Sequence, residues 1–207
     1  MVNKNIIIGY SGHSYVVLDV LDSIGVNCFA YCDLEEKSKN PFFLKYLGKD
    51  NDKKLLNKLS SFNAYLGIGN NQIRSEGYLN FKKYNVNFPS AVHSRSYISA
   101  HSRISDGVII MAGVIINPFV EIGVGTICNS GSIVEHECKI GRFVHLAPGS
   151  VLTGQVEVGD FSFIGANSVV RQGVKIGKNV IIGAGAVVLR DVLDNSIVFG
   201  NPGKIKG

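Results

Sequence analysis

A six-residue period in the second half of the chain constrains the fold more than any other feature. Every sixth residue from Ile98 to Val188 is apolar, without exception over sixteen positions. With 45% apolar residues in the chain, chance gives such a run with a probability on the order of a few in a million for one fixed register. A period of six excludes an amphipathic helix, whose period is 3.6, and predicts short strands separated by turns. The positions are Ile98, Ile104, Ile110, Ile116, Ile122, Cys128, Val134, Ile140, Leu146, Leu152, Val158, Ile164, Val170, Ile176, Ile182 and Val188.

A second column of residues follows the first at a distance of four. Its members, from Ser102 through Ser132 and Ser168 to Ala186, are all small or β-branched. Glycine often follows the first column, as at Gly123 and Gly159, and glycine allows the tight turns that short coils require. We therefore predict a parallel β-helix in which both columns point inward and each coil pairs with the coils above and below it.

The first part of the chain lacks this period and follows a different pattern. Three apolar runs each end at a glycine or an acid, and helical patterns follow the first and the third run. This β-α-β order predicts a small parallel sheet with helices packed on it. We place the boundary between the two domains at residue 90, giving domains 1–90 and 91–207. The apolar runs are 5–10, 28–32 and 64–68.

Polar residues dominate the segment 34–60, which we predict to be an exposed excursion with a helix around 53–59. The first apolar run ends in the turn Gly9-Tyr10-Ser11-Gly12. A glycine turn that opens a helix presents free N–H groups to a phosphate, and Asp33 after the second run is well placed for a ribose or a base. The same residues are equally compatible with a simple tight turn and a solvated acid.

Composition narrows the classes of partner. The four cysteines form no C-x-x-C pair, so we expect free thiols and no metal site. The net charge of +5 comes without a dense basic stripe, which argues against nucleic acid and is compatible with anionic small molecules. No run approaches the roughly 18 apolar residues of a membrane span, and we predict a cytoplasmic protein.

Three sequence pieces carry a resemblance to a known family. They are S-G-H at 11–13, I-G-N-N at 68–71 and N-S-G-S-I-V-E-H-E-C-K-I-G at 129–141. With these pieces the chain resembles the bacterial hexapeptide-repeat sugar acetyltransferases. That family includes the UDP-4-amino-sugar N-acetyltransferase of bacillosamine synthesis and the sialic acid O-acetyltransferases. The resemblance implies a small Rossmann-like α/β domain followed by a left-handed parallel β-helix with three hexads per coil.

The resemblance also implies roles for individual residues. It makes His136 the catalytic base and Glu137 the carboxylate that raises its basicity. Cys32 stands where the family has the first of two acids, so the nucleobase preference stays open. The implied nucleotide-sugar contacts are Ser11, Gly12, His13, Asp33, Gly69, Asn70 and Asn129, and the implied acetyl-CoA contacts are His145, Ala166 and Ala184.

The function that follows is acetyl-CoA-dependent N-acetylation of a nucleotide-linked amino sugar, such as a UDP-4-amino-4,6-dideoxy sugar, in bacterial surface glycan biosynthesis. The alternative is O-acetylation of sialic acid or a related sugar. A hexapeptide-repeat binding protein without activity, akin to the carbonic-anhydrase-like relatives, would need several metal-binding histidines around one coil. Only His136 and His145 fall within the middle coils. The family further implies a homotrimer with its active site between subunits.

Overall fold

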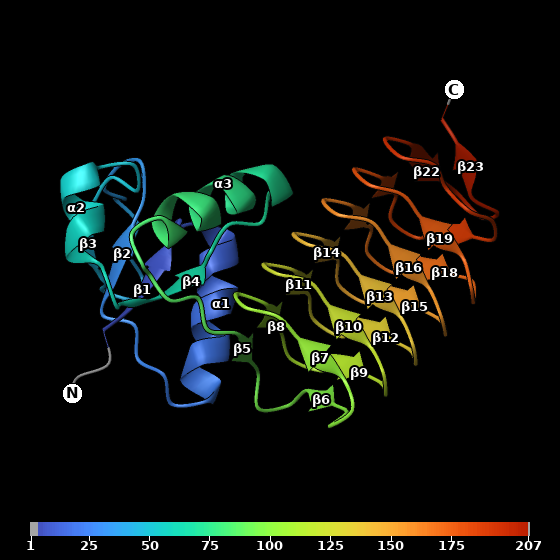
Figure 1. Ribbon diagram of the computed structural model, residues 1–207, viewed down its shortest axis with the longest axis horizontal. Helices are drawn as coiled ribbons and strands as arrows, with labels where there is room; N and C mark the ends of the chain where they lie inside the picture. The colour runs from blue at the N-terminus through green and yellow to red at the C-terminus, as the bar shows by residue number, and fades with distance from the viewer. Residues whose placement is uncertain (1–3, 207) are drawn as a thin grey trace.

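The chain forms two parts that differ in architecture, as Figure 1 shows: a small α/β part at the N-terminus and a column of coils that ends at the C-terminus. The computed structural model describes residues 4–206. No helix within these residues is long and apolar enough to cross a membrane.

The N-terminal part is built on a parallel sheet of four strands in the order β3-β2-β1-β4. Strand β3 lies in the segment that we predicted to be an exposed excursion, so this prediction was wrong at that point. It occupies the edge of the sheet and its side chains are exposed or half-buried. An edge strand of this kind therefore shows no buried apolar run in the sequence. The strands are β1 (Asn5–Ile8), β2 (Ala30–Cys32), β3 (Lys45–Gly48) and β4 (Asn63–Leu66).

Three helices cover the two faces of this sheet. Successive strand residues point to opposite faces, so Ile7 packs with α1 while Ile6 and Ile8 pack on the side of α2 and α3. The helices are α1 (Gly12–Ser23), α2 (Lys53–Lys58) and α3 (Asn71–Lys82).

The second part is a parallel β-helix whose strands pair with those eighteen residues away. Ile127 faces His145, and His145 faces Phe163. Eighteen residues are three hexads, so the predicted parallel β-helix with three hexads per coil is confirmed. Both inward columns are buried over most of their length and form one core.

The coils stack into three sheets. We call the sheet that meets the N-terminal part the junction face, and we name the other two, the apolar face and the charged face, by their outward side chains. The junction face contains β5 (Ala91–Val92), β8 (Ile109–Ile110), β11 (Ile127–Cys128), β14 (His145–Leu146), β17 (Phe163–Ile164), β20 (Ile181–Ile182), β22 (Ile197–Phe199) and β23 (Lys204–Ile205). The apolar face contains β6 (Tyr97–Ile98), β9 (Ile115–Ile116), β12 (Ile133–Val134), β15 (Val151–Leu152), β18 (Val169–Val170) and β21 (Val187–Val188). The charged face contains β7 (Arg103–Ile104), β10 (Glu121–Ile122), β13 (Lys139–Ile140), β16 (Glu157–Val158) and β19 (Lys175–Ile176).

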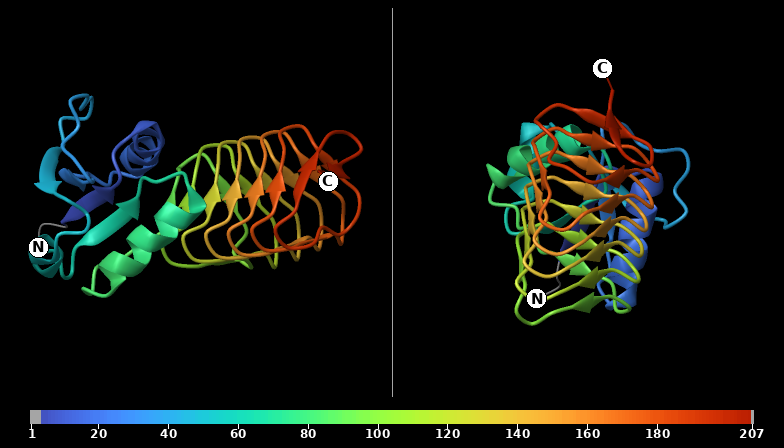
Figure 2. Two further views of the ribbon diagram at one scale, coloured as in Figure 1. Left: turned by 90° about the horizontal axis from the view of Figure 1, so that it is seen from above. Right: turned by 90° about the vertical axis from the view of Figure 1, so that its right-hand side faces the viewer.

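The N-terminal part covers only the first coils of the junction face. Outward residues Ala91, Ile109 and Ile127 are buried in one cluster with the apolar side of α1, and Figure 2 shows α1 alongside the coils. The next outward residue on this face is His145. The end of the covered region therefore coincides with one of the predicted site residues.

Candidate active site

His136 and Glu137 form a hydrogen-bonded pair at the corner between the apolar face and the charged face. The Nδ1 atom of His136 lies 3.0 Å from Oε2 of Glu137. The two side chains are 48% and 51% exposed, so a substrate can reach them. A carboxylate at Nδ1 holds the proton on that nitrogen and leaves Nε2 free to accept another. The pair is therefore built to take up a proton.

Two residues of the next coil contact this pair, and the sequence analysis identified neither of them. A Cβ atom at Gly154 would lie 2.5 Å from Cε1 and 2.6 Å from Nε2 of His136, so the ring occupies the space that a side chain would need. The Nε2 atom of Gln155 lies 3.3 Å from Oε2 of Glu137. Both follow His136 and Glu137 by eighteen residues, and this offset is the signal that could have found them.

His145 lies on the junction face, on strand β14, and is buried under the N-terminal part. Its Nδ1 is 3.3 Å from the carbonyl oxygen of Gly69, and its Nε2 is 3.1 Å from Nδ2 of Asn129. The backbone N–H of Ser130 donates to Oδ1 of Asn129 at 2.8 Å, which turns the amide nitrogen toward the ring. Asn129 therefore donates to Nε2, and His145 donates from Nδ1 to Gly69.

The two histidines at this junction are held in the neutral form. Burial, with a further contribution from the nearby charge of Arg74, lowers the pKa of His145 to about 4. Burial also lowers the pKa of His13 to about 4, with smaller contributions from His145 and Arg74. The two ring centroids are 5.9 Å apart. Within residues 4–206, Nε2 of His13 is buried and has no hydrogen-bond partner.

Arg74 ties the two parts of the chain together, a role that the sequence analysis did not assign to it. Its side chain is completely buried, and burial lowers its pKa to about 9. Its hydrogen-bond acceptors are carbonyl and amide oxygens from both parts of the chain, and none of them is a carboxylate. The acceptors are the carbonyl groups of Ile68, Gly69, Gly125, Phe143 and Val144 and the side chain of Asn71.

Asp33 lies beside the turn that opens α1, and its carboxylate is engaged by that turn. One oxygen accepts from the backbone N–H of Tyr10 at 2.8 Å, and the other accepts from that of Leu34 at 2.7 Å. Lys37 forms an ion pair with Asp33 at 3.2 Å. The side chain therefore fixes the turn in addition to the ligand contact that we predict for it.

The turn presents Ser11, Gly12 and His13 at the N-terminus of α1. Ser11 is the N-cap residue and its side chain is exposed. A Cβ atom at Gly12 would meet nothing within 4 Å, so the space above the turn is open. The first N–H groups of a helix have no partner within the helix and can bind an anion.

The N-terminus of α3 borders a second opening. A cavity of about 380 Å³ lies between α3 and the junction face, and it includes the predicted contacts Gly69 and Asn70. The side chain of Asn70 accepts from the N–H of Ile73 at 3.1 Å and caps the helix. The cavity is also lined by Asn71, Gln72, Phe161, Phe163, Asn179 and Ile181.

Ala166 and Ala184 stack one coil apart at the corner between the junction face and the apolar face. The N–H of Gly185 donates to the carbonyl oxygen of Ala166 at 2.8 Å. Asn129 starts the same corner two coils earlier. This edge therefore presents mainly backbone and small side chains along the column of coils.

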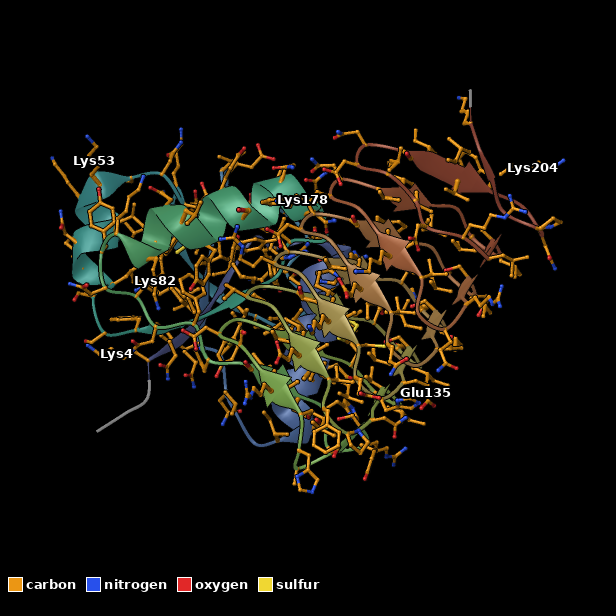
Figure 3. The ribbon with its side chains drawn as sticks, turned by 45° about the vertical axis from the view of Figure 1, so that its right-hand side comes forward. Lys4, Lys53, Lys82, Glu135, Lys178 and Lys204 are labelled. Atoms are coloured by element: carbon orange, nitrogen blue, oxygen red, sulfur yellow. The ribbon has the colours of Figure 1, made fainter. Side chains whose placement is uncertain are left out.

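The structure gathers the predicted residues at two places rather than one. His13, Gly69, Asn129 and His145 meet at the junction, whereas His136 lies at the far end of strand β12. Figure 3 shows Glu135, the neighbour of His136, on the side of the β-helix away from α3. Within one chain, the junction and the corner do not form a single site.

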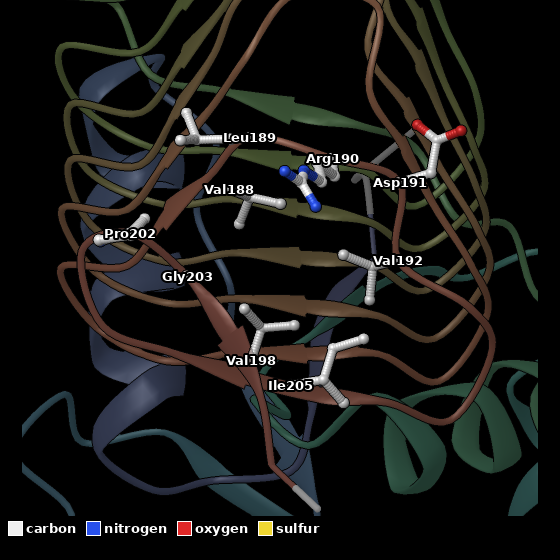
Figure 4. A pocket seen from close by; sticks show the side chains of 9 residues that line it. All are labelled: Val188, Leu189, Arg190, Asp191, Val192, Val198, Pro202, Gly203 and Ile205. Atoms are coloured by element: carbon white, nitrogen blue, oxygen red, sulfur yellow. The ribbon is translucent and has the colours of Figure 1, made fainter.

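Other features of the described residues lie apart from these two places. A cavity of about 370 Å³ at the C-terminal end of the β-helix is lined mainly by apolar residues such as Val188 and Val192 (Figure 4). None of the predicted site residues lines it. Within residues 4–206, no group of three or more histidine, cysteine or acidic residues could hold a metal ion.

Comparisons with family models agree with the two parts of the fold. Residues 4–80 match the PglD N-terminal domain, and residues 155–190 match the bacterial transferase hexapeptide of six repeats. The search of curated proteins finds no match.

Solved structures match the whole chain. A mutant of perosamine N-acetyltransferase from Caulobacter crescentus, in complex with CoA and GDP-perosamine, is 33% identical with a TM-score of 0.93, and the match covers 100% of this chain and 98% of that one. The acetyltransferase domain of PglB from Neisseria gonorrhoeae, in complex with acetyl coenzyme A, is 30% identical with a TM-score of 0.92, covering 99% of both chains. WeeI from Acinetobacter baumannii has the same fold at 24% identity, with a TM-score of 0.85 and coverage of 98% and 99%.

Proposed function

The chain belongs to the hexapeptide-repeat sugar N-acetyltransferases, and from this membership we propose that it transfers the acetyl group of acetyl-CoA to the amino group of a nucleotide-linked amino sugar, with His136 as the general base. The observation that carries this proposal is the hydrogen bond between His136 and Glu137, which leaves Nε2 of an exposed imidazole free.

Each step of the transfer has a group suited to it. The amine attacks the thioester carbonyl, and Nε2 of His136 takes the proton that the nitrogen loses. Glu137 stabilises the imidazolium that forms. The proton then passes to the sulfur of coenzyme A as the C–S bond breaks. The amide product and free thiol account for all atoms, and no covalent intermediate on the enzyme is needed.

The junction supplies the groups that hold the substrates. We assign the sugar nucleotide to the N-terminus of α1, where Ser11, Gly12 and His13 lie beside Asp33 and the space above Gly12 is open. Gly69, Asn70 and Asn129 line its path to the reacting groups. We assign His145 to the acetyl-CoA site as a neutral ring held by Gly69 and Asn129, and the chain of acetyl-CoA to the edge formed by Ala166 and Ala184.

The identity of the sugar nucleotide is part of the proposal. The Caulobacter relative is in complex with GDP-perosamine, and the sequence analysis gave a UDP-4-amino-4,6-dideoxy sugar as an example while it left the nucleobase open. Both are amino sugars carried on a nucleoside diphosphate, a class that suits the phosphate-binding geometry of the turn. We place the reaction in bacterial surface glycan biosynthesis and in the cytoplasm.

We propose that the enzyme is a homotrimer in which neighbouring copies complete the site. The outward residues of the apolar face are half-buried or exposed, and a surface of this kind is typical of a contact with another chain. A second copy could bring its His136 corner to the junction of the first. Light scattering at micromolar concentration should give the mass of three chains, and a monomer would contradict this part of the proposal. The residues are Tyr97, Ile115, Ile133, Val151, Val169 and Val187.

The two parts of the chain have separate tasks in this proposal. Domain 1–90 binds the sugar nucleotide, and domain 91–207 binds acetyl-CoA and carries the base. A protein that lacks residues 1–90 should therefore bind acetyl-CoA without binding sugar nucleotides, measured by calorimetry.

The experiment that tests the function is a screen of acceptors. The protein is incubated with acetyl-CoA and UDP- and GDP-linked amino sugars, and with free sialic acid, while thiol release is followed. We expect turnover with at least one nucleotide-linked amino sugar and an N-acetyl signal in the product by NMR. Turnover of sialic acid alone, with an O-acetyl product, would replace this proposal with the O-acetyltransferase alternative.

A further inference from the structure

The His136–Glu137 pair rests on two residues of the following coil, Gly154 and Gln155. The backbone N–H of Gln155 donates to the carbonyl oxygen of His136 at 2.9 Å, so the two corners are stacked in register. Glu137 and Gln155 have φ angles of 60° and 62°, in the left-handed region that non-glycine residues seldom adopt. Their side chains leave the corner from equivalent backbone positions, one coil apart.

The amide of Gln155 is directed to the oxygen that orients His136. Its Nε2 lies 3.3 Å from Oε2 of Glu137, the same atom that accepts from Nδ1 of His136 at 3.0 Å. A carboxylate oxygen can accept both bonds. Because the amide is neutral, it restrains the carboxylate without cancelling the negative charge that the imidazolium needs. A lysine or arginine at this position would compete with His136 for that charge.

The absence of a side chain at Gly154 leaves room for the imidazole of His136. A side chain there would overlap the ring at Cε1 and Nε2, and the φ angle of Gly154 lies outside the left-handed region. Glycine is therefore required at this position by the space that His136 occupies rather than by the backbone. An added methyl group would push an exposed, movable side chain away from Glu137.

We infer that Gln155 is a positioning residue for the acetyl transfer: it holds Glu137 against His136, while Gly154 leaves the space in which the base sits. This inference rests on the proposed role of His136. Gln155 touches neither the reacting amine nor the thioester in this scheme and acts only through Glu137.

A double-mutant cycle between positions 155 and 137 tests the inference. Gln155→Ala should lower kcat by about two- to tenfold, the range expected for one lost coupling, with both KM values within twofold of wild type. Gln155→Glu, which has the same shape without the donor, should lower kcat at least as much. On a Glu137→Ala background, Gln155→Ala should have no further effect, because its target is gone. Gln172→Ala, a glutamine exposed at the same corner one coil further on, is the matched control and should keep wild-type kcat.

Gly154→Ala provides an independent check. It should lower kcat more than Gln155→Ala while the thermal midpoint stays within a few degrees of wild type, because the methyl group displaces only the exposed ring. Additive effects of Gln155→Ala and Glu137→Ala, or an unchanged kcat in Gln155→Ala and Gln155→Glu, would overturn the inference. If His136→Ala itself kept wild-type activity, the proposed base would fail instead, so the two failures are distinguishable.

Discussion

The corner that holds His136 and the junction that holds His145 place the same side chain in opposite environments. His136 is about half exposed and bonded to a carboxylate. His145 is buried, bonded to a backbone carbonyl and an amide, and close to the positive charge of Arg74. The first environment stabilises an imidazolium, and the second opposes it.

This difference separates two uses of histidine in one chain. A base must change its charge during the reaction, which requires access and a nearby negative group. A residue that only donates or accepts a hydrogen bond benefits from a fixed neutral form, and the bonds of His145 to Gly69 and Asn129 fix its proton on Nδ1. Sequence position alone does not distinguish the two, since both histidines lie in the middle coils.

The largest effect on stability should come from replacing Arg74, the buried cation at the contact between the two parts of the chain. Arg74→Met removes a donor from six oxygens, of which those of Gly69 and Val144 keep a second donor. Each oxygen left unsatisfied is costly, although the loss of a buried charge offsets part of this cost. We expect a loss of about 2–4 kcal/mol in the free energy of unfolding, measured by thermal or urea denaturation. Arg95→Met, at an exposed site, is the control and should stay within about 0.5 kcal/mol of wild type. Equal stability of both variants would show that Arg74 does not hold the two parts together.

The neutral histidines of the junction should make stability depend on pH. Burial lowers the folded-state pKa of His13 and His145 to about 4 from 6.5, so both remain neutral in the folded chain where the unfolded chain already binds protons. The unfolded state therefore gains protons first as the pH falls. Stability should be constant above about pH 7 with respect to these groups and should fall from about pH 6.5 toward pH 4. Thermal midpoints between pH 8 and pH 5 measure this. A His13→Gln/His145→Gln protein should show a flatter profile, whereas the exposed-site control His101→Gln should keep the wild-type slope.

A smaller effect separates substrate binding from proton transfer. His145→Gln removes the ring that we assign to the acetyl-CoA site and its bonds to Gly69 and Asn129. A loss of positioning worth about one hydrogen bond corresponds to roughly a tenfold rise in KM for acetyl-CoA. The pH dependence of kcat should keep its shape, because His145 does not titrate in the range of the assay. A lost acid limb of the pH profile in this variant would move the base from His136 to His145.

The sequence was sufficient to predict the β-helix because its period repeats in every coil. The apolar position of each hexad, such as Ile122 or Leu152, is buried in the same way, so one rule describes nearly half of the chain. The N-terminal strands β1, β2 and β4 were also predictable from their apolar runs. Strand β3 was not, because its residues stay exposed or half-buried, whereas β4, at the opposite edge of the sheet, has a buried apolar run.

The site was predictable only where a motif named its residues. His136 and Glu137 lie next to each other in the sequence, whereas Gln155 reaches Glu137 through the stacking of coils. Arg74 gave no signal for its role, because its partners are backbone oxygens, which carry no side-chain pattern. The placement of His136 and His145 on different sides of the β-helix likewise follows from the three-sided coil rather than from any local motif.

The kinetics of His136→Ala test the central claim, that the exposed histidine is the base, most directly. With the acceptor found by the screen, we expect kcat to fall by about 10²–10⁴, the usual contribution of a general base. The KM for acetyl-CoA should change little, because the junction remains intact. A kcat within twofold of wild type would contradict the account and remove His136 from the mechanism.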